Sequence, residues 1–128
     1  MEINTHQGIN REFCGTPVKA EKNHASIEMI TSEDMSVDDT GLIHGGFIFG
    51  LADHAAMLAV NHPNVVLAGS SCKFRLPLVP GEKITASAAV TKEENNRYTV
   101  AVAVKRGEDT VFTGDFFCAV LKNHVLES

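Results

Sequence analysis

The sequence predicts one α+β domain over residues 1–128, in which an antiparallel sheet of about five or six strands wraps around one long central helix. Two observations lead to this fold class. A strongly apolar segment of helix-forming residues stands near the middle of the chain. Four strand-like runs, separated by short polar turns, follow it. A chain of 128 residues has room for one hydrophobic core and little room for a second.

The segment ahead of the helix carries weaker signals. Residues 1–23 are mixed and polar, and the Gly-Thr-Pro sequence at residues 15–17 has the composition of a turn. Residues 25–31 form a candidate first strand, because apolar and polar residues alternate there. Residues 32–41 have loop composition and lead into the helix.

The predicted helix covers about residues 45–61. Ala, Leu, Met and Phe dominate this segment, and His62-Pro63 ends it, since proline does not continue a helix. The apolar residues cover nearly every side of the helix. A helix of this kind is buried on most faces and does not lie on a surface.

Four strand-like runs follow the helix, and in them apolar residues alternate with small or polar ones. The polar spacers at residues 93–96 and 106–109 are typical of hairpin turns between antiparallel neighbours. The runs occupy residues 65–79, 83–92, 97–106 and 110–121.

Composition excludes several classes of partner. A net charge of -5 does not supply the basic face that nucleic acids and anionic membranes require, so we expect neither as a partner. No apolar stretch approaches the roughly 20 residues of a membrane span, and the N-terminus lacks the apolar core of a secretory signal. We therefore expect a cytoplasmic protein.

The cysteines and histidines do not form a recognisable metal or disulfide pattern. Cys14, Cys72 and Cys118 are odd in number and widely spaced, which favours reduced thiols. The histidines show no ligand-like spacing. The one pair that comes near to it is His54, in the middle of the predicted helix, and His62, just after its end. We expect no metal ion and no other cofactor.

Asp53 is the outlier of the predicted helix. A carboxylate in an apolar helix costs several kcal/mol when it is buried without partners. One interpretation is that Asp53 points into a wet interface or bonds a neighbouring backbone group. The other is that it is a functional acid whose pKa is tuned by its surroundings. The adjacent His54 is either a local variation or a group that helps to tune that pKa.

The tripeptide His44-Gly45-Gly46 stands at the predicted helix start. Free N–H groups at a helix N-terminus, with the helix dipole behind them, favour a negatively charged oxygen. A thioester carbonyl that becomes an oxyanion would use such donors, and glycine lets a ligand come close to the backbone. The alternative is that two glycines only permit a tight path from the loop into the helix.

Together these features resemble a known family. HGGFIFGLADHAAMLA (residues 44–59) is similar to the signature of hotdog-fold acyl-CoA thioesterases of the phenylacetyl-CoA thioesterase type. FRLPLVPGEKI (residues 74–84) resembles the strand-to-turn segment of that family, and the resemblance covers roughly residues 37–121. It implies a hotdog fold and the hydrolysis of a small or aromatic acyl-CoA.

The resemblance also implies a role for each matching residue. Asp53 would be the nucleophile, or the general base that activates water. The Gly45 backbone N–H would polarise the thioester carbonyl, and His44 would help to shape the part of the site around this N–H. Gly46 and Asp38 are candidate substrate-binding residues. Asp38 stands six residues before His44, where the family often has Asn.

One inference about assembly does not need the family. Gly45 and Asp53 are eight residues apart on one helix, about 12 Å along its axis. A reacting carbonyl needs both the donor and the carboxylate at about 3 Å, which one helix does not provide. Two antiparallel copies related by a two-fold axis do provide it. We therefore expect a homodimer with two shared sites, and the resemblance implies that such dimers often pair into homotetramers.

Two other functions stay open. One is a non-catalytic hotdog module that binds acyl-CoA. Members of that kind carry a DNA-binding segment, and the roughly 23 residues ahead of the first predicted strand are too few for a helix-turn-helix. The other is a hydratase or dehydratase, whose Asp/His or His/Glu pairs we do not find. Lys73 and Arg75 are candidates for CoA phosphate contacts or for a solvated face.

Overall fold

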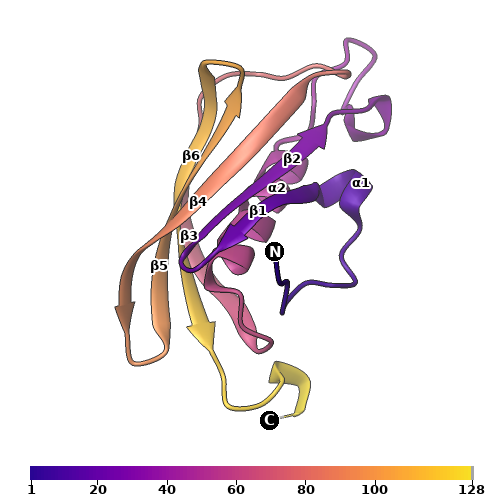
Figure 1. Cartoon of the computed structure of the whole chain (residues 1–128). Helices are drawn as coiled ribbons and strands as arrows, with labels where there is room; N and C mark the ends of the chain where they lie inside the picture. The colour runs from indigo at the N-terminus through magenta and orange to yellow at the C-terminus, as the bar shows by residue number, and fades with distance from the viewer. Residues whose placement is uncertain (128) are drawn as a thin grey trace.

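The computed structural model describes residues 1–127 and has one six-stranded antiparallel sheet curved around a long helix, α2 (Figure 1). The strands lie in the order β1-β2-β4-β5-β6-β3. This architecture confirms the predicted fold class. The regular elements are α1 (Arg11–Cys14), β1 (Thr16–Glu21), β2 (His24–Ile30), α2 (Gly45–Val60), β3 (Val65–Phe74), β4 (Lys83–Glu94), β5 (Arg97–Arg106) and β6 (Asp109–Val120), with short 3-10 turns at Glu33–Met35 and Val125–Glu127.

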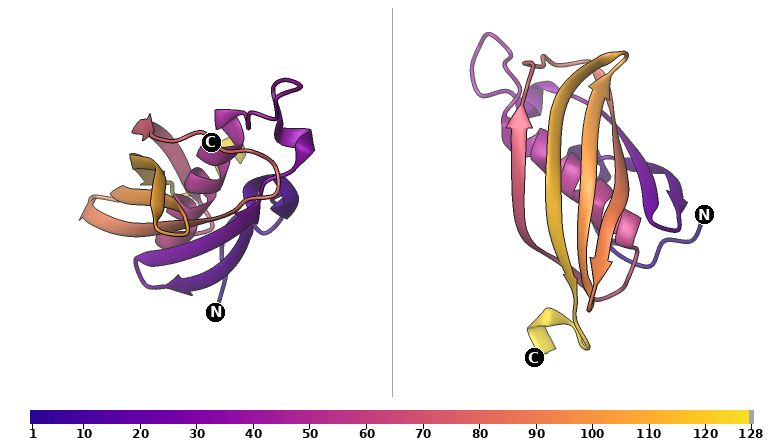
Figure 2. Two further views of the ribbon diagram at one scale, coloured as in Figure 1. Left: turned by 90° about the horizontal axis from the view of Figure 1, so that it is seen from above. Right: turned by 90° about the vertical axis from the view of Figure 1, so that its left-hand side faces the viewer.

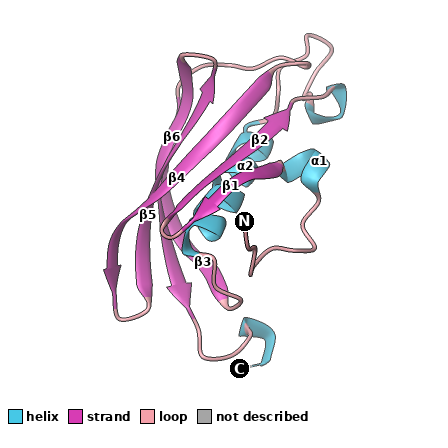
Figure 3. Cartoon of the chain, in the orientation of Figure 1, coloured by secondary structure: helices cyan, strands magenta, loops and turns pink. Residues whose placement is uncertain are grey.

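Helix α2 fills the concave side of the sheet, as the view from above shows (Figure 2). Most of its side chains are buried and apolar, which confirms the expectation of a helix covered on most faces. The helix ends at Val60 because Asn61 adopts a left-handed conformation (φ 53°) and donates its N–H to the Met57 carbonyl at 2.8 Å. Within residues 1–127, no helix is long and apolar enough to cross a membrane (Figure 3).

The predicted hairpins are confirmed. Strands β4 and β5 are joined by Asn95 and Asn96, whose positive φ values of 50° and 64° suit the right-handed twist of a tight hairpin. Strands β5 and β6 are joined through Gly107, with φ 59°. These turns lie within the spacers that the sequence analysis assigned.

Strand β1 was not predicted, and the expected turn at residues 15–17 is wrong in part. Gly15 does turn the chain (φ 90°), but Thr16 already begins the strand. Strand β1 pairs with β2 alone, its register shifts between Pro17 and Lys19, and most of its side chains are exposed. An edge strand that buries so few side chains does not need strict alternation of apolar and polar residues, and it tolerates proline. The sequence pattern that indicates a strand is therefore weak here.

Strand β3 ends earlier than predicted, at Phe74 instead of Val79. The N–H groups of Arg75 and Leu76 both turn to the Val111 carbonyl, at 2.8 and 3.3 Å. The chain then leaves the sheet and crosses its end. This early exit brings Phe74 beside the first turn of α2, where the candidate site lies.

Candidate functional site

His44 shapes the beginning of α2. Its backbone is extended (φ -64°, ψ 128°), and its Nδ1 accepts the Gly46 N–H at 3.2 Å. Its carbonyl accepts the Phe47 N–H at 3.1 Å. His44 is therefore the N-cap of the helix, a role that side chains with a short-range acceptor fill. The N–H of Gly46 is used inside the protein, and the His44 ring covers its Cα, since a Cβ there would lie 3.1 Å from His44 Nε2. A substrate contact from Gly46 remains a prediction.

Gly45 is the first residue of α2, and its N–H has no acceptor among residues 1–127. The helix dipole points its positive end at this donor. The ring of Phe74 packs on the same residue, because a Cβ placed on Gly45 would lie 3.0 Å from Phe74 Cε1. Gly45 thus combines an unused donor with close packing that any side chain would disturb.

A hollow of about 350 Å³ opens beside this donor. Its lining residues have apolar side chains apart from Gly45 and Arg75, and none of them carries a carboxylate. The size falls at the lower end of the range for small-molecule sites, roughly 300–1,000 Å³. The lining residues are Leu42, Ile43, Gly45, Ile48, Phe74, Arg75, Leu76, Pro77 and Leu78.

Asp53 lies two turns further along α2 and is half-buried. Its Oδ1 is buried and has no hydrogen-bond partner among the described residues. Burial without a partner disfavours the charged form and raises the pKa of Asp53 from 3.8 to about 6. A carboxylate with this pKa is largely ionised at pH 7 and is still basic enough to take a proton.

Two cysteines stand near Asp53, and no metal-binding set does. Burial, with a smaller effect of the Asp53 charge, raises the pKa of Cys14 and raises that of Cys118 to about 12. Both therefore remain protonated thiols and are poor nucleophiles at neutral pH. Over residues 1–127, no three His, Cys, Asp or Glu side chains gather closely enough to hold a metal ion.

His54, the neighbour of Asp53 in the sequence, bonds the N-terminal segment. It is buried, and its Nδ1 lies 2.9 Å from the Cys14 carbonyl, so Nδ1 must carry the proton and donate it. The His6 ring stacks on it with centroids 6.2 Å apart. Burial lowers the pKa of His54, and the nearby His6 and Arg11 lower it further. His54 is a neutral side chain that fixes the N-terminal segment against α2.

Asp38 organises a turn. Its Oδ1 accepts the N–H groups of Thr40, Gly41 and Leu42 at 3.0, 3.1 and 3.3 Å. The loop that precedes α2 depends on these bonds. The carboxylate is exposed, so a substrate contact from Asp38 remains a prediction.

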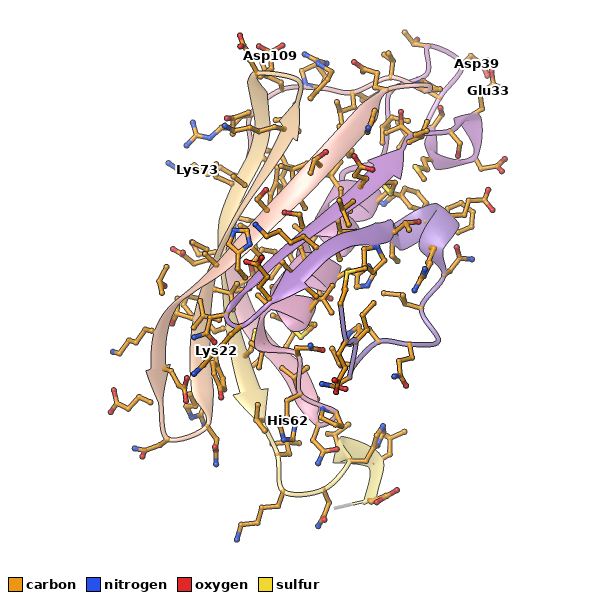
Figure 4. All side chains as sticks on the ribbon, viewed as in Figure 1. Lys22, Glu33, Asp39, His62, Lys73 and Asp109 are labelled. Carbon is orange, nitrogen blue, oxygen red and sulfur yellow. The ribbon has the colours of Figure 1, made fainter. Side chains whose placement is uncertain are left out.

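Of the two candidate phosphate contacts, Lys73 lies on the outer face of the sheet, and Arg75 borders both that face and the hollow beside Gly45. Lys73 points away from α2 in Figure 4, and its register partner Thr113 alternates with the buried Phe112. Arg75 Nε donates to Thr113 Oγ1 at 3.1 Å. Both cations therefore border the outer face of the sheet.

The sequence analysis predicted Gly45 and Asp53 as site residues and did not consider Phe74, whose ring packs on Gly45. Nothing in the local sequence links Phe74 to Gly45, which is 29 residues earlier in the chain. Its exposure, 53 %, is unusual for a phenylalanine at the end of a strand whose inner-face neighbours pack on the core. One protomer leaves Gly45 and Asp53 on the same helix, about 12 Å apart along its axis.

This arrangement, a curved antiparallel sheet wrapped around one apolar helix, is the hotdog fold. The sequence profile described as "Thioesterase superfamily" matches residues 40–113, more than half of the chain, including α2 and its N-cap. The chain belongs to the thioesterase superfamily.

Three similar proteins are informative. An uncharacterised protein from Pyrococcus horikoshii, PH1136, has a solved structure with TM-score 0.97 and 43 % identity, covering 98 % of this chain and 97 % of that one. Methylthioribose-1-phosphate isomerase of Aquifex aeolicus is 50 % identical over 121 residues, 94 % of this chain but 26 % of the isomerase. Transcription factor FapR of Caldanaerobacter subterraneus is 28 % identical over 120 residues, 93 % of this chain and 60 % of FapR.

The chain therefore spans about a quarter of the isomerase and less than two thirds of FapR. Those names describe the longer proteins. What this chain shares with them is the part that corresponds to a thioesterase-superfamily domain.

Proposed function

We propose that this protein is an acyl-CoA thioesterase in which Asp53 is the nucleophile or the general base. The observation that carries the proposal is the state of Asp53, a carboxylate with a buried, unpartnered Oδ1 and a pKa raised to about 6 inside an apolar helix. Such a group is unfavourable for folding and useful for proton transfer near neutral pH. Membership of the thioesterase superfamily gives the reaction class.

The reaction we propose begins when the thioester carbonyl accepts the Gly45 N–H. This donor stabilises the negative charge that develops on the oxygen. Water then attacks the carbonyl carbon and gives its proton to Asp53, or the Asp53 carboxylate attacks and water releases the acyl group afterwards. The C–S bond breaks, and the sulfur leaves as the thiolate of CoA and takes up a proton. The products are a carboxylic acid and CoA.

This proposal requires a second copy of the chain, because one helix separates its donor from its acid by about 12 Å. An antiparallel pair of α2 helices places Gly45 of one copy opposite Asp53 of the other and creates two equal sites. Strand β3 lies at the edge of the sheet and has one strand neighbour, β6, within the protomer. Its other edge is available for pairing, which supports the homodimer.

The substitution Asp53→Asn tests the proposal. It keeps the shape of the side chain and removes its charge and basicity, so kcat should fall by roughly 10²-fold or more. KM should change less, because CoA binding draws on contacts remote from the acid. Thermal stability should hold or rise, since a poorly solvated carboxylate is lost. Thiol release and thermal unfolding should be measured on the same sample.

Asp38→Asn is the matched control. It makes the same chemical change at a carboxylate that anchors a loop, and we expect turnover to remain within a few-fold of the wild type. Near-normal turnover of Asp53→Asn, with a lowered melting temperature, would instead make Asp53 a structural residue.

A second candidate function is acyl-CoA binding without hydrolysis. The similarity to FapR, a transcription factor, favours it, because a regulatory protein has no need of turnover. Calorimetric titration with acyl-CoA and with CoA, beside the thiol-release assay, separates the two functions. Tight binding without thiol release would support the binding module.

A further inference from the structure

The ring of Phe74 adjoins the donor at the start of α2 and is held there by its neighbours. Its edge packs on Gly45, and its ring lies 5.1 Å from that of Phe112, in an edge-to-face arrangement at 73°. Phe112 is fully buried. One side of the Phe74 ring is therefore fixed by the core, while 53 % of the residue remains exposed.

The exposed part of Phe74 lines the hollow that also contains Gly45. Leu42 and Leu76, at 42 and 40 % exposure, continue the apolar wall, and Arg75 is the single charged residue in the lining. The Nε of Arg75 is directed to Thr113. A hollow lined mostly by apolar side chains, with no carboxylate and with the unpaired N–H of Gly45 at its edge, suits a carbonyl oxygen that has an apolar group beside it.

We propose that Phe74 determines the acyl specificity of this site, favouring thioesters with an apolar group of ring size directly beside the carbonyl over acetyl esters. The inference rests on the proposed function, since it assumes that the carbonyl is bound at the Gly45 N–H. The adjoining acyl carbons then lie against the exposed part of the Phe74 ring. An acetyl group is too short to cover that ring, so it gains little from it. A benzoyl group covers it and gains the attraction between two aromatic rings in addition to burial.

The test compares benzoyl-CoA with acetyl-CoA as probes. In the wild type we expect a higher kcat/KM for benzoyl-CoA. Phe74→Ala should lower that value about ten-fold while changing the value for acetyl-CoA less than about three-fold. Phe74→Leu keeps apolar bulk without a ring, so its kcat/KM for benzoyl-CoA should lie between those of the wild type and Phe74→Ala. Phe117→Ala is the control, because Phe117 is also exposed (42 %) but sits in the strand position that alternates with the buried Phe116.

A binding experiment separates this inference from the proposed function. With Asp53→Asn to slow any turnover, calorimetry should give a lower Kd for benzoyl-CoA than for acetyl-CoA. Adding Phe74→Ala should remove most of that difference. If no ester is hydrolysed but this binding difference is found and lost as described, the thioesterase proposal fails and the specificity of Phe74 stands.

Two results would overturn the inference. In the first, the two esters are used and bound equally well by the wild type. In the second, Phe74→Ala has the same ratio of kcat/KM for benzoyl-CoA to kcat/KM for acetyl-CoA as the wild type. If Phe74→Ala keeps that ratio and dissociates the oligomer in sedimentation, the ring is an interface residue and does not select the acyl group.

Discussion

At the scale of single residues, the proposed chemistry depends on two groups that have no hydrogen-bond partner. Asp53 has a buried oxygen with no hydrogen bond, and Gly45 has an N–H with no acceptor, among the residues described. The two histidines that flank them in the sequence have partners. His44 caps Gly46, and His54 donates to Cys14. Three other buried side-chain atoms, His24 Nδ1, Ser32 Oγ and Ser36 Oγ, also lack a partner among the described residues. Asp53 differs from them because it is an acid with a raised pKa, as expected of a group that meets a substrate.

The pH dependence of activity and stability follows from the raised pKa of Asp53. If the ionised carboxylate is the active form, kcat should rise with pH with an apparent pKa of about 6. Stability should change in the opposite direction. The folded protein holds the Asp53 proton up to about pH 6, whereas the unfolded chain releases it near 3.8, so this group lowers the free energy of unfolding as pH rises from 3.8 to about 6.

Thermal unfolding from pH 4 to pH 7, compared between the wild type and Asp53→Asn, checks the stability effect. The difference in melting temperature should grow across this interval in favour of the variant. A difference that stays constant with pH would contradict the assigned pKa.

The donor at Gly45 is testable by a substitution that removes its N–H. Gly45→Pro lacks the N–H, and proline is well tolerated at the first helical position after an extended residue such as His44. We expect kcat/KM to fall roughly 10²–10³-fold with the helix retained. Gly45→Ala is the control, because it adds the same Cβ near Phe74 and keeps the N–H. Equal activity of the two variants would exclude the N–H as the donor.

At the scale of elements, α2 is positioned by a close crossing with the N-terminal segment. Gly15 joins α1 to β1 with φ 90°, and the chain passes directly over the helix there. A Cβ on Gly15 would lie 2.6 Å from Leu51 Cδ1, 2.7 Å from Ile27 Cγ2 and 2.9 Å from the Glu28 carbonyl. The crossing therefore has no space for any side chain.

Gly15→Ala should lower the free energy of unfolding by more than about 2 kcal/mol, since it adds overpacking to backbone strain. Gly81→Ala isolates the strain alone, because Gly81 has a similar φ of 88° and open space where the Cβ would be. We expect that control to lose about 1 kcal/mol. Urea unfolding of both variants gives the comparison, and equal losses would mean that crowding at the crossing is unimportant.

At the scale of the whole molecule, the proposal gives each protomer two half-sites that belong to different active sites. The shared-site proposal makes a quantitative prediction for mixed assemblies. Gly45→Pro and Asp53→Asn should each be nearly inactive as homodimers. A heterodimer of the two contains one intact pair, Gly45 from one copy and Asp53 from the other, beside one doubly altered pair.

Refolding an equal mixture of the two variants should therefore restore about a quarter of the wild-type activity, since half of the dimers are mixed and each has one working site. Each variant refolded alone is the control. An inactive mixture, in which differently tagged copies are shown to have associated, would contradict sharing of the site. So would a fully active wild-type monomer in sedimentation at micromolar concentration.

The sequence by itself determined the features that depend on local patterns. The helix, its beginning at Gly45 and the outlier Asp53 follow from composition and periodicity over a few turns. The hairpin at residues 95–96 follows from turn chemistry. These features are encoded among near neighbours in the chain, so no long-range contact is needed to predict them.

Only the tertiary structure decided what depends on distant residues. Strand β1 exists because β2 offers it an edge, and its own residues bury too little to show a pattern. Phe74 reaches Gly45 because β3 leaves the sheet early. The pKa of Asp53 is set by how much water the surrounding elements exclude, a property of packing that spacing along the chain does not contain.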